Sequence, residues 1–309
     1  MTGALLLVVA AALLVAGAEL FVENAAGAAR RLGVTVIAVG VLLAGAEPEE
    51  LLTAVIAAVQ DRPGLAAGDA IGANVTMLTV TLGLAALLRP LPLGRRVRQY
   101  ALLSAVAGLL AVLTLIGGLV SRLEGGLLVA AYVGLVALVW WREKEPPALG
   151  ELAEIEAESD EPGARRPGVA LALAVMGIAL MLAGGDLAVR GAVRVVDAIG
   201  RSDSAVGLTV LALATTAELF ALVLTAARHD VPEIAVAGIV GSAAYNATAT
   251  LGAAALARPL AVDGVLPSAV AAAALPLVVL LLARRGRLVR PAGVLLCAGY
   301  TAYVVLVLA

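Results

Sequence analysis

Long apolar runs separated by short polar breaks follow one another along the whole chain. Many of them are long enough to cross a bilayer as an α-helix, which takes about 20 residues. We count ten spans, at residues 3–27, 33–59, 65–88, 99–119, 124–141, 168–196, 204–227, 232–257, 266–283 and 290–308. The runs do not alternate apolar and polar residues as the strands of a membrane barrel do. The pattern therefore predicts an all-α integral membrane protein.

The composition and the charges support this interpretation. The 309 residues are 62% hydrophobic and 14% charged, whereas soluble domains are about half apolar and a quarter charged. Most of the 21 Lys and Arg residues fall in loops on one side of the ten spans. The positive-inside rule then predicts a multi-pass protein of the plasma (inner) membrane with both termini outside and the 142–167 loop in the cytoplasm. A single cysteine, Cys297, excludes an internal disulfide.

One apolar phrase occurs twice, as IGANVTMLTVTLGLAALLRPL at 71–91 and as VGSAAYNATATLGAAALARPL at 240–260. The two superimpose at an offset of 169 residues, and the same offset places Glu49 on Glu218. We infer two homologous five-helix repeats, residues 1–141 and 168–309, joined by the acidic cytoplasmic linker 142–167. Five spans is an odd number, so the second repeat must be inverted relative to the first, as in many secondary transporters. The alternative is that helices rich in Ala, Leu and Gly resemble one another by composition alone.

Glu49 and Glu218 each lie well inside an apolar span. A carboxylate at the centre of a bilayer costs roughly 2.5–3.5 kcal/mol, so such residues generally have a function. Matched positions of inverted repeats should converge near the midplane, where two carboxylates must share a cation or a proton. Pro48 would free a backbone carbonyl beside Glu49, and hard cations prefer oxygen ligands. The alternative is that both glutamates take part in structural hydrogen bonds.

Two further acids and several polar residues flank this pair. On a continuous helix Glu47 lies about 200° from Glu49 and Glu50 about 100° away, and neither has an acidic counterpart in the second half. They could line an access path, exchange protons or be solvated within a cavity. Of the nearby polar residues we favour Asn246 as a ligand, because an amide in lipid needs partners. Ser and Thr in membrane helices can instead bond to their own backbone.

The chain resembles the sodium/calcium exchanger family, within the cation/calcium antiporters, in both of its repeated motifs. AGAEPE (44–49) and LATTAE (213–218) are similar to that family's second-helix signature, and GANVTM (72–77) and GSAAYN (241–246) to its third-helix signature. The resemblance covers essentially the whole chain and implies ten helices in two inverted halves. It implies cation-ligating roles for five residues: Glu49, Glu218, Asn246, Ser242 and Thr215. Five other positions lack the family's usual hydroxyl or amide side chains: Gly45, Ala46, Ala73, Met77 and Ala214.

We therefore expect a secondary active cation antiporter that moves calcium against a sodium gradient by alternating access. The closest alternative is a proton-coupled cation/proton antiporter moving calcium or sodium, and a non-transporting membrane scaffold or ion sensor is an alternative of another class. No enzyme activity is expected, since no Ser/His or paired-His constellation lies within the spans. Calcium and sodium ions and membrane lipids are the expected partners. We expect no organic cofactor, nucleotide or nucleic acid.

Overall fold

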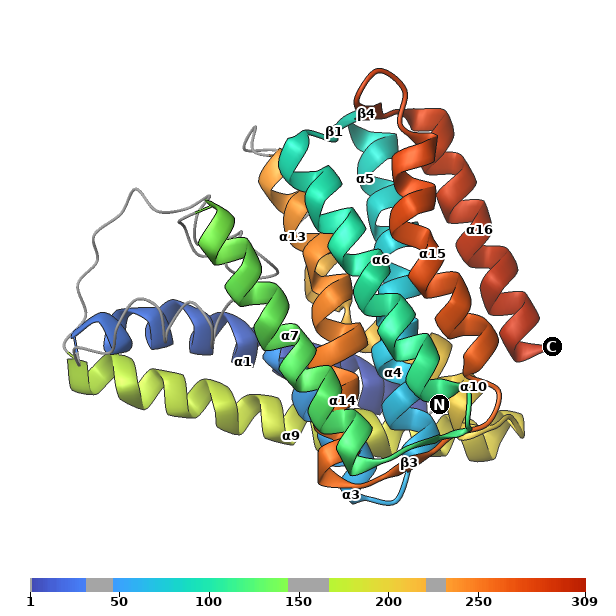
Figure 1. The fold of residues 1–309 in the computed structure, drawn as a ribbon. Helices are drawn as coiled ribbons and strands as arrows, with labels where there is room; N and C mark the ends of the chain where they lie inside the picture. The colour runs from blue at the N-terminus through green and yellow to red at the C-terminus, as the bar shows by residue number, and fades with distance from the viewer. Residues whose placement is uncertain (1, 32–46, 144–166, 221–231) are drawn as a thin grey trace.

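The computed structural model describes residues 2–31, 47–143, 167–220 and 232–309, and the chain over these ranges is almost entirely helical (Figure 1). The first-half elements are α1 (Thr2–Arg31), α3 (Pro48–Val59), α4 (Pro63–Thr76), η1 (Met77–Thr81), α5 (Leu82–Leu88), β1 (Leu91–Pro92), α6 (Arg95–Leu115), β2 (Leu119–Val120) and α7 (Arg122–Glu143). The second-half elements are α9 (Pro167–Ile199), α10 (Asp203–Val206), η2 (Gly207–Leu211), α11 (Ala212–Thr215), α13 (Pro232–Tyr245), η3 (Asn246–Thr250), α14 (Leu251–Ala257), β3 (Leu260–Ala261), α15 (Leu266–Leu282), β4 (Arg287–Leu288) and α16 (Arg290–Leu308). The three η elements are single π-helical turns within longer helices.

Six helices in the described ranges are long and apolar enough to cross a membrane. They occupy Gly3–Phe21, Pro63–Leu88, Arg95–Leu115, Arg122–Arg142, Gly168–Ile199 and Arg290–Leu308. Two shorter apolar helices occupy Asp203–Thr215 and Leu266–Leu282. All eight coincide with spans expected from the hydropathy pattern. The mostly helical membrane protein that the sequence predicts is confirmed, while parts of the expected spans 33–59 and 204–227 and most of the linker lie outside the described residues.

The elements themselves repeat at the offset found in the sequence. Residues 63–92 fold as α4, η1, α5 and β1, and adding 169 to each boundary gives α13, η3, α14 and β3. The strands also pair between the halves: β1 pairs with β4, and β2 with β3, each antiparallel. The two small sheets lie at opposite ends of the helical bundle (Figure 1). A repeat whose equivalent strands lie at opposite ends is the geometry expected of two halves related by inversion.

The helices α1 and α9 form a long pair that runs across the remaining helices (Figure 1). Small residues permit their close contact: a Cβ on Gly17 would lie 2.8 Å from the carbonyl oxygen of Gly177, and one on Gly177 would lie 2.6 Å from that of Gly17. The pair contacts the rest of the molecule mainly where α9 packs on α3. These two equivalent helices thus form a unit beside the core.

Within the core, α4 packs directly on the backbone of α10 and η2. Gly64, Gly68 and Gly72 form one stripe of α4, and a Cβ on any of them would overlap atoms of Ser204 or Leu208. For Gly72 the overlapping atom is the Leu208 carbonyl oxygen, which belongs to a helix and cannot rotate away. This contact joins the third helix of the first half to the second helix of the second half. It therefore fixes the distance between the two halves beside the buried polar residues.

We predict that Gly72→Ala lowers the thermal stability of the detergent-purified protein. The added methyl group would overpack a rigid backbone contact, which costs typically about 1–3 kcal/mol. Gly134→Ala is the matched control, because Gly134 lies within α7 and nothing is within 4 Å of a Cβ placed there. Thermal unfolding should give a lower midpoint for Gly72→Ala and an unchanged or higher one for Gly134→Ala. Equal midpoints for the two variants would show that α4 is not packed as described.

Candidate cation site

The second helix of the first half begins at the acidic motif. Pro48 is the first residue of α3, and Glu47 precedes it in a non-helical conformation with φ −101° and ψ 77°. Proline suits the first helical position because its missing N–H would have no partner there. The sequence suggested that Pro48 would interrupt the hydrogen bonding inside a helix. Instead, Pro48 is the first residue of α3. Glu49 and Glu50 lie in the first turn, where the positive end of the helix dipole favours carboxylates.

In the second half a non-helical residue occupies the position equivalent to Glu47. Helix α11 ends at Thr215, Thr216 forms a turn, and residues 217–220 are helical again. Thr216 lies 169 residues after Glu47, so Glu49 and Glu218 are each the second residue of the helical segment that follows these positions. Ala217 occupies the position of the first-half proline. The Thr216 hydroxyl donates to the Ala212 carbonyl at 2.7 Å.

Five carboxylates are buried in this region. Glu47 is fully buried, Glu49, Glu50 and Asp69 are each 1% exposed, and Glu218 is 8% exposed. No lysine, arginine or histidine is buried within the described ranges. The burial of Glu49 and Glu218 agrees with the expectation from the sequence. The full burial of Glu47 separates its carboxylate from bulk water.

Asn246 joins Glu47 of the first half to the second. Its amide nitrogen donates to Glu47 Oε2 at 3.0 Å, and its carbonyl oxygen accepts the Thr250 hydroxyl at 3.0 Å. Both ends of the amide are therefore held by side chains, as expected for an amide in a membrane protein. The sequence predicts Asn246 as a cation ligand, and the structure places its amide among buried polar side chains. The sequence did not identify Glu47 as one of them.

Asp69 is a buried acid that the sequence analysis missed. It lies on α4 and accepts the Thr215 hydroxyl at Oδ1 over 3.0 Å, which again joins the two halves. Because its equivalent in the second half is Gly238, a search for acids repeated at the 169-residue offset passes over it. The available signal was simpler: an acid within an apolar span is a functional candidate whether or not it is repeated.

The remaining positions named from the sequence are Ser242 and the positions where this chain lacks the polar residues of the family motif. Ser242 donates to the Gly238 carbonyl of its own helix at 3.1 Å, which leaves its oxygen able to accept. Ala73 and Met77, which replace polar residues of the family motif, are both fully buried. Gly45 and Ala46 lie outside the described residues.

In the described part of the chain no group of three or more His, Cys, Asp or Glu residues is arranged to hold a metal ion. A cation here would therefore need hydroxyl, amide, carbonyl or water oxygens beside its carboxylates.

The three π-helical turns share one sequence feature. Each has a threonine as its third residue, and that hydroxyl donates to the carbonyl four residues earlier. The pairs are Thr79 with Val75, Thr209 with Ala205 and Thr248 with Ala244. The hydroxyl thus satisfies a carbonyl where the regular helical hydrogen-bonding pattern changes. π-Helical turns often occur at functional sites, and Asn246 is the first residue of one of them.

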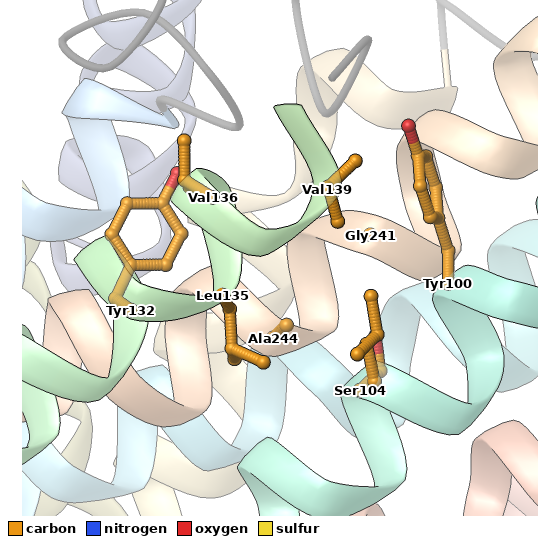
Figure 2. Close-up of a pocket in the computed structure, with 9 residues that line it drawn as sticks. Tyr100, Ser104, Tyr132, Leu135, Val136, Val139, Gly241 and Ala244 are labelled. Carbon is orange, nitrogen blue, oxygen red and sulfur yellow. The ribbon is translucent and has the colours of Figure 1, made fainter. Parts of the chain in front are cut away.

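A pocket lies between α6, α7 and α13. Tyr100 on α6 and Tyr132 on α7 stand at its two sides, with Gly241 and Ala244 between them (Figure 2). Tyr132 also packs edge-on against Tyr245, with ring centroids 5.2 Å apart. The described residues that line the pocket include no acid. Tyr245 directly precedes Asn246, so the aromatic pair joins a residue that lines the pocket to the neighbour of Asn246.

Comparison with known proteins identifies the family. The family model described as sodium/calcium exchanger protein matches residues 2–141 and 169–309. The chain belongs to the sodium/calcium exchanger family. The two matched segments correspond closely to the two halves expected from the sequence, and the resemblance drawn from the motifs is confirmed.

Relatives of this sodium/calcium exchanger family member are membrane proteins of similar length. CaxA, a candidate antiporter of Alkalimonas amylolytica, is 32% identical over 256 residues, which cover 81% of this chain and 79% of CaxA. The inner membrane protein YrbG of Escherichia coli is 30% identical over 269 residues, covering 84% and 81%. The solved structure of the sodium/calcium exchanger from Methanococcus jannaschii superimposes with a TM-score of 0.60 at 23% identity, over 98% of both chains. At that identity the structural match supports the fold.

We predict that Glu47 and Asn246 stabilise the fold jointly. Replacing either by alanine leaves a buried polar group without its partner, which costs about 1–3 kcal/mol. The double variant should be less destabilised than the sum of the single variants, with a coupling energy of about 0.5–3 kcal/mol. Thermal unfolding of Glu47→Ala, Asn246→Ala and the double variant measures this energy. Thr301→Ala, at an exposed hydroxyl, is the control partner for Glu47→Ala and should give additive effects. Additivity in the Glu47–Asn246 cycle would contradict the prediction.

Proposed function

We propose that this exchanger family member is a secondary active antiporter that moves calcium against a sodium gradient by alternating access. Membership of the family and the antiporter relative support a cation/calcium antiporter. The observation that carries the proposal is the burial of Glu49 and Glu218 at equivalent positions, each the second residue of a helical segment that follows a non-helical residue. Broken helices with carboxylates near them are where secondary transporters bind their ions.

The architecture that we propose is ten transmembrane helices in two inverted five-helix repeats, residues 1–141 and 168–309, joined by the linker 142–167. The elements that recur at an offset of 169 support this division, as do the two strand pairs at opposite ends of the bundle. We place the protein in the plasma (inner) membrane with both termini outside and the linker in the cytoplasm. The distribution of Lys and Arg along the sequence supports this orientation.

In this proposal, Glu49 and Glu218 supply the main cation ligands and Asn246, Ser242 and Thr215 supply neutral oxygens. Calcium takes six to eight oxygen ligands, so backbone carbonyls and water would complete its shell. The α1–α9 pair would move against the core to expose the site to each side in turn. Two observations support movement of this pair as a unit. Outside α3 it makes few contacts with the core, and small residues lie along its length.

A proton-coupled variant is the second candidate, and a specific observation favours it. Ala73 and Met77 are fully buried at positions where the family motif usually has a hydroxyl and an amide. Without these side chains, sodium would lose two of its expected ligands. Calcium transport could then be driven by protons carried on the buried carboxylates.

Calcium flux into proteoliposomes under an imposed sodium or proton gradient tests the proposal. We expect calcium movement that depends on the sodium gradient and falls at least about tenfold in Glu49→Gln and in Glu218→Gln. Asp263→Asn, at an exposed acid in a turn, is the control and should transport normally. Flux that follows the proton gradient alone would favour the proton-coupled variant. Absence of flux with every gradient, or unchanged flux in both glutamine variants, would contradict the proposal.

A further inference from the structure

Arginines gather at one end of the helical bundle, around the β1–β4 sheet (Figure 1). Residues 94–99, at the start of α6, and residues 284–290, between α15 and α16, contain seven arginines and no acidic residue. The sheet holds the two segments together, and the Leu93 N–H donates to the Gly286 carbonyl at 2.8 Å. Six of the seven are exposed and form what we name the arginine cluster: Arg95, Arg98, Arg284, Arg285, Arg287 and Arg290.

A tight turn fixes the second-half part of this cluster. The backbones of Arg284 and Arg287 bond to each other in both directions, at 2.9 and 3.1 Å. Between them Arg285 and Gly286 have φ values of 52° and 75°, as in the two-residue turns of β-hairpins. The three arginines of the turn line a hollow. A Cβ on Gly286 would lie 3.7 Å from Nη2 of Arg98, so an arginine of the first half reaches the same turn.

The arginine cluster lies where membrane-spanning helices begin. Two of the helices that are long and apolar enough to cross a membrane start at Arg95 and at Arg290. Leu102 follows Arg98 by four residues on α6, and Val294 follows Arg290 by four on α16, and both apolar side chains are 55% exposed. Residues four apart lie on one face of a helix. Each of these faces therefore carries an arginine at the membrane boundary and an exposed apolar side chain one turn further along the helix.

The fold does not require this positive charge. The repeat supplies an internal comparison, because the β2–β3 sheet forms a similar antiparallel pair at the opposite end of the bundle. None of the positions 169 residues away from the seven arginines is charged: Gly264, Val265, Pro267, Leu115, Ile116, Gly118 and Ser121. The arginines are thus an addition at one end of the molecule, and a negatively charged ligand fits them.

We propose that the arginine cluster binds the phosphate groups of anionic membrane phospholipids, whose acyl chains lie along the exposed apolar faces of α6 and α16. Guanidinium groups bind phosphate oxygens through paired hydrogen bonds, and basic pockets at the ends of membrane helices bind anionic headgroups. The positive ends of the α6 and α16 dipoles add to the same potential. In the orientation proposed above, this end faces the cytoplasmic leaflet. Because the arginines come from both halves, a bound headgroup bridges the halves at the β1–β4 sheet.

Native mass spectrometry of the full-length protein in neutral detergent tests this inference. The protein is titrated with phosphatidylglycerol and, separately, with the neutral lipid phosphatidylcholine, and bound lipids are counted. We expect the wild type to bind phosphatidylglycerol in preference to phosphatidylcholine. The affinity for phosphatidylglycerol should fall about tenfold or more in Arg95→Gln/Arg98→Gln and in Arg284→Gln/Arg287→Gln, because each variant removes two positive charges.

Matched variants separate loss of the lipid site from loss of charge or folding. Arg194→Gln/Arg201→Gln removes two exposed arginines outside the cluster and should bind phosphatidylglycerol as the wild type does. Arg95→Lys/Arg98→Lys keeps the charge and should retain most of the binding. Melting temperatures measured without lipid should match the wild type in the glutamine variants, which shows that they are folded.

Three outcomes would overturn the inference. The first is equal binding of the two lipids by the wild type, and the second is unchanged phosphatidylglycerol binding in both glutamine variants of the cluster. The third is release of phosphatidylglycerol by excess inorganic phosphate, which would assign the arginines to a soluble anion. The antiport proposal does not depend on any of these results, since the cluster lies apart from the buried carboxylates.

Discussion

The structure is organised around the burial of carboxylates in a protein core that lies within a membrane. Five acids are buried together with several amides and hydroxyls, and the described residues include no buried basic side chain. In lipid such an arrangement is costly unless the negative charge is offset by helix dipoles, hydrogen bonds or a bound cation. The positions of Glu49 and Glu218 in the first turn of a helical segment and the hydrogen bonds between the halves both reduce this cost.

Three buried side-chain hydrogen bonds join one half of the chain to the other. Thr215 of the second half bonds Asp69 of the first, and Asn246 bonds Glu47. The Asn74 amide donates to the Ala243 carbonyl at 2.9 Å, and the two residues are 169 positions apart in sequence, the repeat offset. The glycine stripe of α4 brings the same halves into backbone contact. The site is thus a property of the interface between the halves, and any movement of one half relative to the other would change it.

Much of this arrangement could be predicted from the sequence because it depends on periodic or repeated features. Hydropathy located the long helices, and the offset of 169 matched residues 63–92 with 232–261, which fold alike. Glu49 and Glu218 were identified because they repeat, and their burial followed from the apolar residues around them. The family motifs led to Asn246, whose amide is indeed held by buried side chains.

The features that could not be predicted from the sequence are residues without an equivalent in the other half and the points at which helices begin or end. The angular argument for Glu47 assumed a continuous helix, but α3 begins at Pro48, so Glu47 instead reaches Asn246. Asp69 was missed because its equivalent is a glycine, and its bond to Thr215 depends on the packing of α4 on α11. The end of α11 before Thr216 occurs without a proline and could not be inferred from local composition. Such contacts between distant segments require the tertiary structure.

The most direct test is to locate a bound ion. A crystal structure of the protein grown with manganese, which scatters anomalously and accepts the same oxygen ligands as calcium, would mark each divalent site. The account predicts an anomalous peak between the two halves, within bonding distance of the Glu49 and Glu218 carboxylates. Peaks confined to the protein surface, or a core in which these two side chains face away from each other, would contradict it.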